Sequence, residues 1–370
     1  MEGSVCVDLN DILQQVCRHF KIEDTFLGYE TVQMGNVNRT YKVNFLLKDG
    51  NPKSFLVQNV NTYAFRNPIG LMDNIDKVTE HIRAKKPGQL ALHFHHTADR
   101  KTYLADGENF WRMTNYVPSV TFNTVTDLNV VRNAGKAFGE FQMDLADFDI
   151  SELTETIPGF HNTRKRYADF LRSVQEDRAG RAEQVREEIN YLLSVQEQAC
   201  CLTDLYNAGQ LPLRVTHNDT KINNVLFTPE GHEAMIVIDL DTVMPGLIGH
   251  DFGDAIRFAA NFVEEDCRSP EKAGVNLEVF RAFAEGFLSM TAGAMTDTEV
   301  KTLAMSCFAL TAELATRFLA DYLDGDLYFN IKCPDHNLIR TRCQIALAKD
   351  MRKHMDEMEQ IVRDCVSKWR

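Results

Sequence analysis

Alternating apolar and polar residues fill the first third of the chain and predict a small antiparallel sheet. This alternation has the period of a strand with one buried face, and the Lys-Asp-Gly-Asn segment at 48–51 is typical of a turn between strands. The predicted strands lie at 25–33, 35–47, 54–60, 91–97, 101–105 and 109–117. Apolar residues at helical spacing predict helices at 5–20 and 71–84. We therefore expect a sheet-rich N-terminal lobe.

After Pro118 the pattern becomes helical, with one exception. In 126–146 the apolar residues recur every three or four positions, as on a helix with one buried face. Further helices are predicted at 164–207, 277–291, 297–323 and 337–367, the first of these segments as two charged, largely exposed helices. The exception is 214–241, where short apolar runs separated by a turn predict strands inside the helical half.

Composition limits the class of protein. The 370 residues are 44% hydrophobic and 25% charged, with a formal net charge of −13. This excess of acid opposes binding to nucleic acid and to anionic membranes, which rely on Lys and Arg. No apolar run reaches the length of a bilayer span and the first residues lack a signal-peptide plan, so we expect a cytoplasmic protein. The nine cysteines are scattered without a C-x-x-C pair, which favours reduced thiols over disulfides or a zinc site.

The chemistry is concentrated between Thr216 and Asp254. Here His217-x-Asp219 is followed by Asn224 five residues after the aspartate, and later by Asp239. Phosphoryl transfer needs magnesium held by oxygen ligands and a carboxylate that orients and deprotonates the attacking hydroxyl. Asp219 suits the base, while Asn224 and Asp239 suit the metal. The alternative is that these residues only cap turns around an ordinary hairpin.

The spacing predicts how the two metal ligands meet. The runs 225–227 and 234–239 are strand-like and are separated by a turn-rich segment. A hairpin centred on that turn pairs Val225 with Ile238 and places Asn224 opposite Asp239. Opposed residues have Cβ atoms about 4.5–5.5 Å apart, which allows two side chains to share one ion.

The sequence Asp251-Phe252-Gly253 has the letters of a protein-kinase metal motif but lies beyond the hairpin. An aspartate at the start of a helix is usually an N-cap, and Asp254 with Arg257 can pair across one turn. We therefore predict that Asp251 and Asp254 shape the loop and do not bind metal. Asp241 stays open between a second metal and the substrate.

These observations predict an α+β, bilobal protein-kinase-like fold. Its β-rich N-terminal lobe, residues 1–112, is expected to bind nucleotide. A hinge at 113–118 leads to a larger helical lobe, 119–370, which carries the catalytic hairpin and the substrate site.

Several longer stretches resemble a known family. They are GNVNRTY, LTETIPGFHNT, LRVTHNDTKINNVL, VIDLDTVMPG, DFGDAIRF, RFLADYLDGDLYF and HNLIRTRCQI. The sequence resembles the aminoglycoside phosphotransferase and choline kinase superfamily and, within it, the N-acetylhexosamine 1-kinases, over nearly the whole chain. This resemblance implies ATP and Mg²⁺ as cofactors and phosphorylation of the anomeric hydroxyl of GlcNAc or GalNAc.

The resemblance also implies roles for individual residues. Asp219 would be the base and Asn224 and Asp239 the magnesium ligands. The residues that would line the sugar pocket are Asn218, Arg317 and Tyr328, with Asn36 as a weaker match. Arg and Asn supply donors for sugar hydroxyls, and Tyr supplies a ring face and a hydroxyl. The alternatives are a salt bridge of Arg317 to the acidic run at 321–326 and a core position for Tyr328.

On the nucleotide side the resemblance is imperfect. Many superfamily members place a lysine on the third strand, whereas this chain has Gln58, which can donate hydrogen bonds but brings no charge. The phosphate loop is poor in glycine, and its expected contacts are Gly35, Asn38 and Thr40; the alternative is a polar hairpin turn. Asn115 lies in the segment expected to receive adenine through backbone groups.

Three hypotheses remain open at this point. The leading one is an N-acetylhexosamine kinase that binds ATP and a small sugar and works without nucleic acid or membrane; a monomer is one possibility, and the sequence does not determine the oligomeric state. A second is a kinase of the same fold for choline, an aminoglycoside or homoserine; cationic acceptors favour carboxylate-rich or aromatic-caged pockets. A third, a catalytically silent protein, would require loss of Asp219, Asn224 or Asp239, and all three are present. The sequence does not rank GlcNAc against GalNAc.

Overall fold

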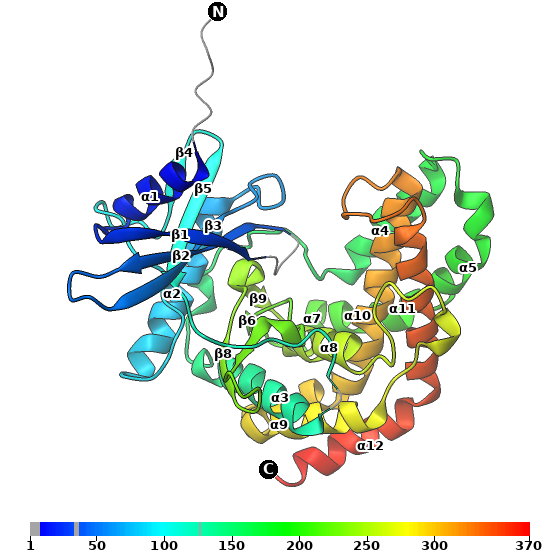
Figure 1. Cartoon of the computed structure of the whole chain (residues 1–370). Coiled ribbons are helices and arrows are strands. Elements are labelled where there is room, and N and C mark those ends of the chain that lie inside the picture. The colour runs from blue at the N-terminus through cyan, green and yellow to red at the C-terminus, as the bar shows by residue number, and fades with distance from the viewer. Residues whose placement is uncertain (1–7, 33–36, 126) are drawn as a thin grey trace, which may run out of the picture. The chain divides into compact units, whose positions relative to one another are not determined.

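The computed structural model describes residues 8–32, 37–125 and 127–370, and the chain forms two compact units (Figure 1). The N-terminal unit comprises Met1–Pro118 together with Ser151–Ile157. The C-terminal unit comprises Ser119–Ile150 and Pro158–Arg370. The segment at 151–157 thus belongs with the N-terminal unit, although it lies far along the chain.

The N-terminal unit contains a five-stranded antiparallel sheet in the order β1-β2-β3-β5-β4. The strands are β1 Thr25–Val32, β2 Arg39–Leu46, β3 Pro52–Asn59, β4 Leu104–Asp106 and β5 Asn109–Asn115. The helices are α1 Leu9–His19 and α2 Pro68–Lys85. The predicted strand at 91–97 is wrong, because only Phe94 pairs there, in an isolated bridge to Thr114.

One face of this sheet is buried by α1. Asp8 caps the helix by accepting from the amide of Asn10, and the helix presents Leu13 and Cys17 to the sheet. These side chains pack with Phe45 and Phe55, whose rings meet edge to face at 5.8 Å. The alternating pattern of the strands therefore faces a real core, as the sequence predicted.

The C-terminal unit is mainly helical. Its helices are α3 Leu128–Asp144, α4 Thr163–Glu176, α5 Arg186–Ser194, α6 Gln196–Ala199, α7 Cys201–Asn207, α8 Ile248–Ala259, α9 Leu277–Thr291, α10 Asp297–Asp324, α11 His336–Lys353 and α12 Met355–Val366. Two small antiparallel pairs are embedded, β6 Arg214–Thr216 with β9 Met244–Gly246 and β7 Val225–Phe227 with β8 Ala234–Val237. Short 3₁₀ turns occur at Ile150–Glu152, Ala182–Val185, Ile222–Asn224, Leu240–Thr242 and Pro270–Lys272.

The prediction of two helices over 164–207 is wrong in number, and the predicted exposure holds only for the charged face. The segment forms four helices, the first of which ends where Asp177 adopts a left-handed conformation with φ 36°. Its apolar face is also buried: Tyr167, Phe170 and Leu192 are fully enclosed in a core with α10. The high density of charge on the opposite face hid this packing in the sequence.

Helix α10 is the central element of the C-terminal unit. It runs for 28 residues from a capping box made by Thr296 and Glu299 to Gly325, whose positive φ of 99° ends it. It alone among the described helices is long and apolar enough to pass as a membrane span, but 78% of the relevant window is buried inside the unit. It is therefore a core helix.

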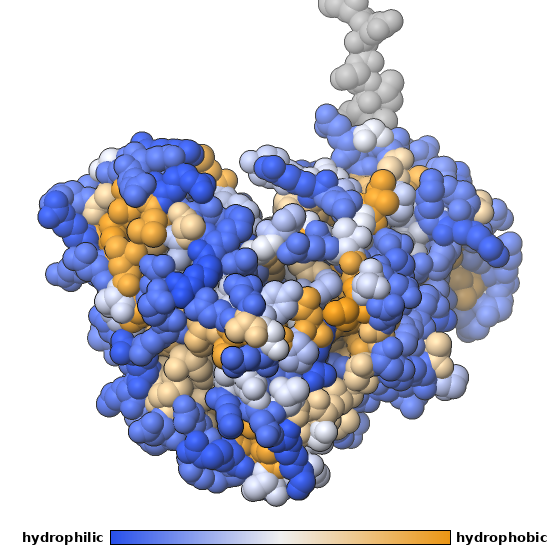
Figure 2. Space-filling model, turned by 180° about the vertical axis from the view of Figure 1, so that it is seen from behind, coloured by the Kyte–Doolittle hydropathy of each residue, from blue (hydrophilic) through white to orange (hydrophobic). Residues whose placement is uncertain are grey.

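The surface is as expected when apolar helices such as α10 are buried in the core. Figure 2 shows one face, on which hydrophilic residues predominate and hydrophobic residues form separate groups. Scattered exposed apolar residues are normal for globular proteins. The described cysteines, eight in number, are all free thiols, as predicted.

Candidate active site

The catalytic loop, defined here as residues 217–224, connects β6 to β7. Its position is set by His217, which is fully buried against the rings of Phe138 and Phe141. The ring accepts at Nδ1 from the amide of Asp219 (3.3 Å), so Nε2 carries the proton and donates to the carbonyl oxygen of Ile238 (2.8 Å). These two bonds fix the tautomer of His217 and tie the catalytic loop to the end of β8.

Asp251 holds the same loop from the other side. Its carboxylate accepts from the amides of His217 (2.9 Å) and Asn218 (2.7 Å) and from Nε2 of Gln142 (2.6 Å). Burial raises the pKa of the Asp251 carboxyl, whereas these N–H donors favour its charged form. Thr220 also donates to the Asp251 carbonyl oxygen. Asp251 thus organises the loop, although the N-cap prediction is wrong: helix α8 begins at Ile248, so Asp251 lies inside it.

The two residues after Asp251 pack the core. Phe252 is fully buried and meets the rings of Phe280, Phe283 and Phe287 at 5.4–5.8 Å. A Cβ on Gly253 would approach the carbonyl oxygen of Ser306 to 2.5 Å, so only glycine lets α8 lie this close to α10. The predicted ion pair is present further along, with Arg257 Nη2 at 2.8 Å from Asp254.

Asp219 is the candidate base, and each oxygen of its carboxylate contacts a neighbouring side chain. Oδ1 lies 3.1 Å from Nζ of Lys221, and Oδ2 accepts from Nδ2 of Asn224 at 3.3 Å. Asp219 and, further away, Asp254 raise the pKa of Lys221, so this amine stays charged. Lys221 is not among the predicted site residues, although a lysine two residues after the aspartate of H-x-D places a cation beside that carboxylate.

The hairpin that follows differs by one residue from its predicted register. Val225 pairs with Val237 and Leu226 with Ile236, and the register then shifts so that Phe227 faces Ala234. Asn224 consequently lies opposite Ile238, whose amide donates to the Asn224 carbonyl oxygen at 2.9 Å. Phe227 also exchanges backbone hydrogen bonds with Val120 on its other side.

Asp239 follows Ile238 in a left-handed conformation with φ 63°. This conformation is uncommon outside glycine and turns the chain sharply after β8. Asp239 is exposed, and it directly follows Ile238, the residue opposite Asn224. The structure therefore brings Asp219, Asn224 and Asp239 to one end of the hairpin, although the predicted direct opposition of Asn224 and Asp239 is wrong.

In the N-terminal unit three polar side chains form a row across neighbouring strands. Gln58 on β3 pairs with Thr40 on β2 and with Arg112 on β5. Arg112 Nε donates to Gln58 Oε1 (2.9 Å), which turns the amide nitrogen of Gln58 toward the Thr40 hydroxyl (3.1 Å). Arg112 is 2% exposed and also contacts Met72 of α2. A guanidinium thus accompanies the glutamine that replaces the expected lysine, and the sequence analysis missed it.

Other predicted nucleotide contacts are only partly described. Gly35 and Asn36 lie outside the described residues. Asn38 accepts from the amide of Asn61 at 3.0 Å. Asn115 is exposed at the end of β5 and its side chain bonds the ring of His95 at 3.0 Å. These roles in nucleotide binding stay predictions.

Arg317 lies on α10 between two aromatic rings. Its guanidinium is 5.2 Å from the centre of the Phe160 ring and 5.7 Å from that of Phe329. No ion pair joins it to the described acidic run at 321–326, whose members have other partners: Asp321 accepts from backbone amides, Asp324 from the Ser173 hydroxyl and Asp326 from Arg181. The salt-bridge alternative for Arg317 is therefore not realised.

The other two predicted sugar contacts are placed very differently. Tyr328 is 69% exposed, so it is not a core residue. Asn218 is 4% exposed and has φ 62°. Its carboxamide accepts from the Thr216 hydroxyl (3.0 Å) and donates to the carbonyl oxygen of Thr242 (3.0 Å). Direct substrate binding by Asn218 would break these bonds, whereas Tyr328 is accessible.

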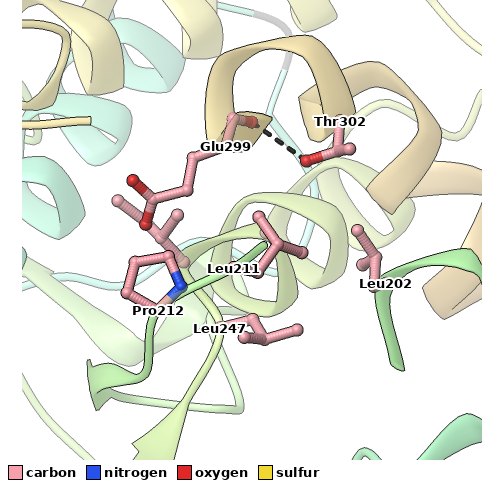
Figure 3. A pocket seen from close by; sticks show the side chains of 8 residues that line it. Leu202, Leu211, Pro212, Leu247, Glu299 and Thr302 are labelled. Atoms are coloured by element: carbon pink, nitrogen blue, oxygen red, sulfur yellow. Dashed lines mark hydrogen bonds between the residues drawn. The ribbon is translucent and has the colours of Figure 1, made fainter. Parts of the chain in front are cut away.

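One pocket in the C-terminal unit lies away from these residues (Figure 3). It is lined mainly by aliphatic groups such as Leu202, Leu211 and Leu247. Its charged lining residue, Glu299, is fully engaged by Arg214 (2.6 and 2.8 Å) and by the amide of Thr296 (2.7 Å). The pocket is a small, mainly aliphatic hollow without the convergent polar groups of a ligand site.

The comparisons with known proteins agree with this geometry. A model described as the phosphotransferase enzyme family (APH) matches residues 31–285, which is more than half of the chain. The chain therefore belongs to this family, whose members are kinase-like phosphotransferases.

Solved structures support the protein-kinase-like fold. An aminoglycoside phosphotransferase from Alicyclobacillus acidocaldarius superposes with a TM-score of 0.65 at 11% identity, covering 98% of each chain. A spectinomycin phosphotransferase, APH(9)-Ia, in complex with ADP and spectinomycin gives 0.60 at 13% identity, covering 95% of this chain and 99% of that one. A microcompartment-associated aminopropanol kinase gives 0.61 at 14% identity, covering 94% and 98%. At these identities the likeness concerns the fold alone.

Proposed function

We propose that the protein is an ATP-dependent kinase that phosphorylates the anomeric hydroxyl of an N-acetylhexosamine, GlcNAc or GalNAc. Asp219 accepts the proton of that hydroxyl as the phosphoryl group is transferred. Lys221, 3.1 Å from the same carboxylate, offers a positive charge to the oxygens of the group in transfer.

Magnesium would be held by Asn224 and Asp239. Asn224 donates from Nδ2 to the backbone and side chain of Asp219, which directs its carboxamide oxygen away from that carboxylate. An amide oxygen and a carboxylate are suitable magnesium ligands, and in kinases the nucleotide phosphates and water supply the remaining positions. Bound there, the ion would neutralise charge on the phosphates.

The acceptor class rests mainly on Arg317. Its guanidinium is stacked between Phe160 and Phe329. Burial lowers the pKa of Arg166, and the nearby charge of Arg317 lowers it further. Two neighbouring cations disfavour a cationic acceptor and supply donors to the hydroxyl and carbonyl oxygens of an acylated sugar. The exposed Tyr328 adds a ring face beside Phe329.

The alternative is a kinase of the same fold that acts on another small alcohol, such as choline, an aminoglycoside or homoserine. Similar structures include kinases named for aminopropanol and ethanolamine, both amines. Purified protein with ATP and Mg²⁺ should release ADP with GlcNAc or GalNAc and not with choline, ethanolamine or an aminoglycoside. Turnover of an amino alcohol without turnover of either sugar would overturn the proposal. We further propose that the enzyme acts in the cytoplasm as a monomer.

A further inference from the structure

A buried chain of hydrogen bonds connects α10 to the catalytic loop through His161, the second residue before α4. His161 Nδ1 lies 2.9 Å from Oε1 of Glu313, and Nε2 lies 3.3 Å from the carbonyl oxygen of Asn218. The side chains of His161 and Glu313 are 8% and 1% exposed. The two residues are 152 positions apart in the chain, so only the fold joins them.

Both ring nitrogens of His161 face an acceptor. The ring therefore lies between an acceptor on α10 and one in the catalytic loop, and an N–H at either nitrogen has a partner. Glu313 remains a carboxylate acceptor: burial acts to raise its pKa, but His161, Arg317 and the Thr163 hydroxyl bring it down to about 2. The hydroxyl of Thr163 donates to the second oxygen of Glu313 at 2.7 Å.

The backbone around His161 is held as firmly as its ring. The carbonyl oxygen of Phe160 accepts two bonds from Arg166, at 3.0 and 2.8 Å. Asn162 caps α4 by accepting from the amide of Lys165 at 3.0 Å. The ring of His161 also lies 4.9 Å from the ring of His250 on α8, the helix that carries Asp251. The imidazole therefore has a single defined place.

This series of hydrogen bonds ends on the backbone of Asn218. Its left-handed conformation costs free energy for a residue other than glycine and persists only where the surroundings enforce it. Asp251 binds its amide, and His161 binds its carbonyl group, which belongs to the same peptide plane as the amide of Asp219. The orientation of that plane determines the direction in which the Asp219 side chain leaves the backbone.

We propose that His161, held by Glu313, is a positioning residue that fixes the 218–219 peptide and thereby aims the Asp219 carboxylate at the acceptor hydroxyl. This inference rests on the proposed role of Asp219 as the base. Arg317 lies one turn beyond Glu313 on α10 and stacks on Phe160, the neighbour of His161. Acceptor binding and aiming of the base therefore use the same short segment.

Two substitutions of His161 separate its two bonds. In His161→Asn the amide nitrogen reaches about as far as Nδ1, so a bond to Glu313 is retained and the bond to Asn218 is lost. In His161→Gln the amide nitrogen reaches about as far as Nε2 and can donate to the Asn218 carbonyl. Thr163→Val is the matched control, because it removes the other donor to Glu313 and leaves the link to Asn218 in place.

Two readouts test the proposal: kcat and KM with ATP and GlcNAc or GalNAc, and amide hydrogen exchange of peptides covering 216–221. His161→Asn should lower kcat by about tenfold to a hundredfold, since small misplacements of a catalytic group have effects of this size, with the KM for ATP nearly unchanged. Exchange in 216–221 should accelerate in this variant. His161→Gln and Thr163→Val should stay within about threefold of wild type in kcat.

Equal losses in the Asn and Gln variants, or unchanged exchange in His161→Asn, would overturn the inference. The exchange experiment needs no acceptor, so it stands even if wild-type protein turns over a different alcohol. Failure of the proposed function is detected separately, by wild-type protein that does not phosphorylate either sugar. In that case the kinetic comparison uses the alcohol that the acceptor panel identifies.

Discussion

His217 donates from Nε2 to the carbonyl oxygen of Ile238 at 2.8 Å, and this bond links two parts of the site that do not pair directly. The amide of Ile238 donates in turn to Asn224 at 2.9 Å. Ile238, the residue that follows β8, is therefore held by the catalytic loop through both its carbonyl oxygen and its amide. Since Asp239 follows immediately, its place relative to Asp219 is set through Ile238.

Asp219→Asn should abolish most of the turnover. The substitution removes the proton acceptor but keeps the size of the side chain, so kcat should fall about a thousandfold, as for loss of a general base. ADP binding, measured by calorimetry, should stay within about threefold of wild type because Asp219 acts mainly in the transition state. A variant that keeps near wild-type kcat would exclude Asp219 as the base.

Asp239→Asn and Asp251→Asn should have different consequences for magnesium. Loss of the Asp239 charge should raise the Mg²⁺ concentration for half-maximal rate about tenfold or more. Asp251→Asn should leave that concentration nearly unchanged. It should instead destabilise the unit by about 2–4 kcal/mol, because an amide group would face N–H donors in a buried site. A magnesium titration and a urea melt of each variant distinguish the two; a shifted titration for Asp251→Asn would make it a metal ligand.

Restoring the family lysine at position 58 should not improve the enzyme. In Gln58→Lys the new ammonium would lie beside Arg112, whose Nε is now 2.9 Å from Gln58 Oε1. The repulsion between this ammonium and the buried guanidinium of Arg112 should lower the unfolding free energy by about 2 kcal/mol. Gln58→Met, which is similar in length and uncharged, is the control for loss of the amide. Unchanged stability of Gln58→Lys would mean that the new ammonium is not held against Arg112.

Arg317→Lys should weaken binding of the acceptor and not of ATP. A lysine keeps the charge but loses the planar group stacked between Phe160 and Phe329. We expect the KM for the sugar to rise about tenfold, or roughly 1.4 kcal/mol, with the KM for ATP unchanged. Arg352→Lys is the control, because Arg352 also stacks on an aromatic ring, Phe308, but in a different part of the unit. An increase of the KM for ATP in Arg317→Lys would place the arginine elsewhere in the reaction.

Glu313 should make the stability of the protein depend on acid. Its pKa is lowered from 4.5 to about 2 in the folded state, so its contribution is fully present above pH 4.5 and is lost as the pH falls toward 2. The contribution is of the order of 3 kcal/mol. Urea unfolding between pH 6 and pH 3 should therefore show the gap between wild type and Glu313→Gln shrinking as the pH falls. A constant gap would mean that the carboxylate is not held in its charged form.

The sequence predicted most strands of the N-terminal unit, because strands such as β2 bury alternate residues; the middle of β5 is instead buried on both faces, and no strand forms at 91–97. It failed at the β7–β8 hairpin, whose pairs differ by one residue from the prediction. It also gave no sign that Phe227 pairs with Val120, a residue more than a hundred positions earlier. Alternation within two strands carries no information about such a third neighbour.

The candidate site was predictable to the extent that its residues are close in the chain. Asp219 and Asn224 fall within one motif, and their mutual contacts follow from local geometry. The pairs His161–Glu313 and Gln58–Arg112 join distant segments, and neither has a distinctive spacing. A buried histidine or arginine is as often structural as functional, so the sequence alone gave no reason to select these residues.

Helix α10 has a consequence for the dynamics of the site. Its 28 residues span about 42 Å, and Glu299 near its start, Glu313 in its middle and Asp321 near its end hold β6, His161 and the backbone before Tyr328 respectively. Opening of this helix along its whole length would release all three together. The middle of α10 should therefore exchange its amide hydrogens only through global unfolding. The region around Arg317, which is proposed to bind the acceptor, should lose its order in a single cooperative step.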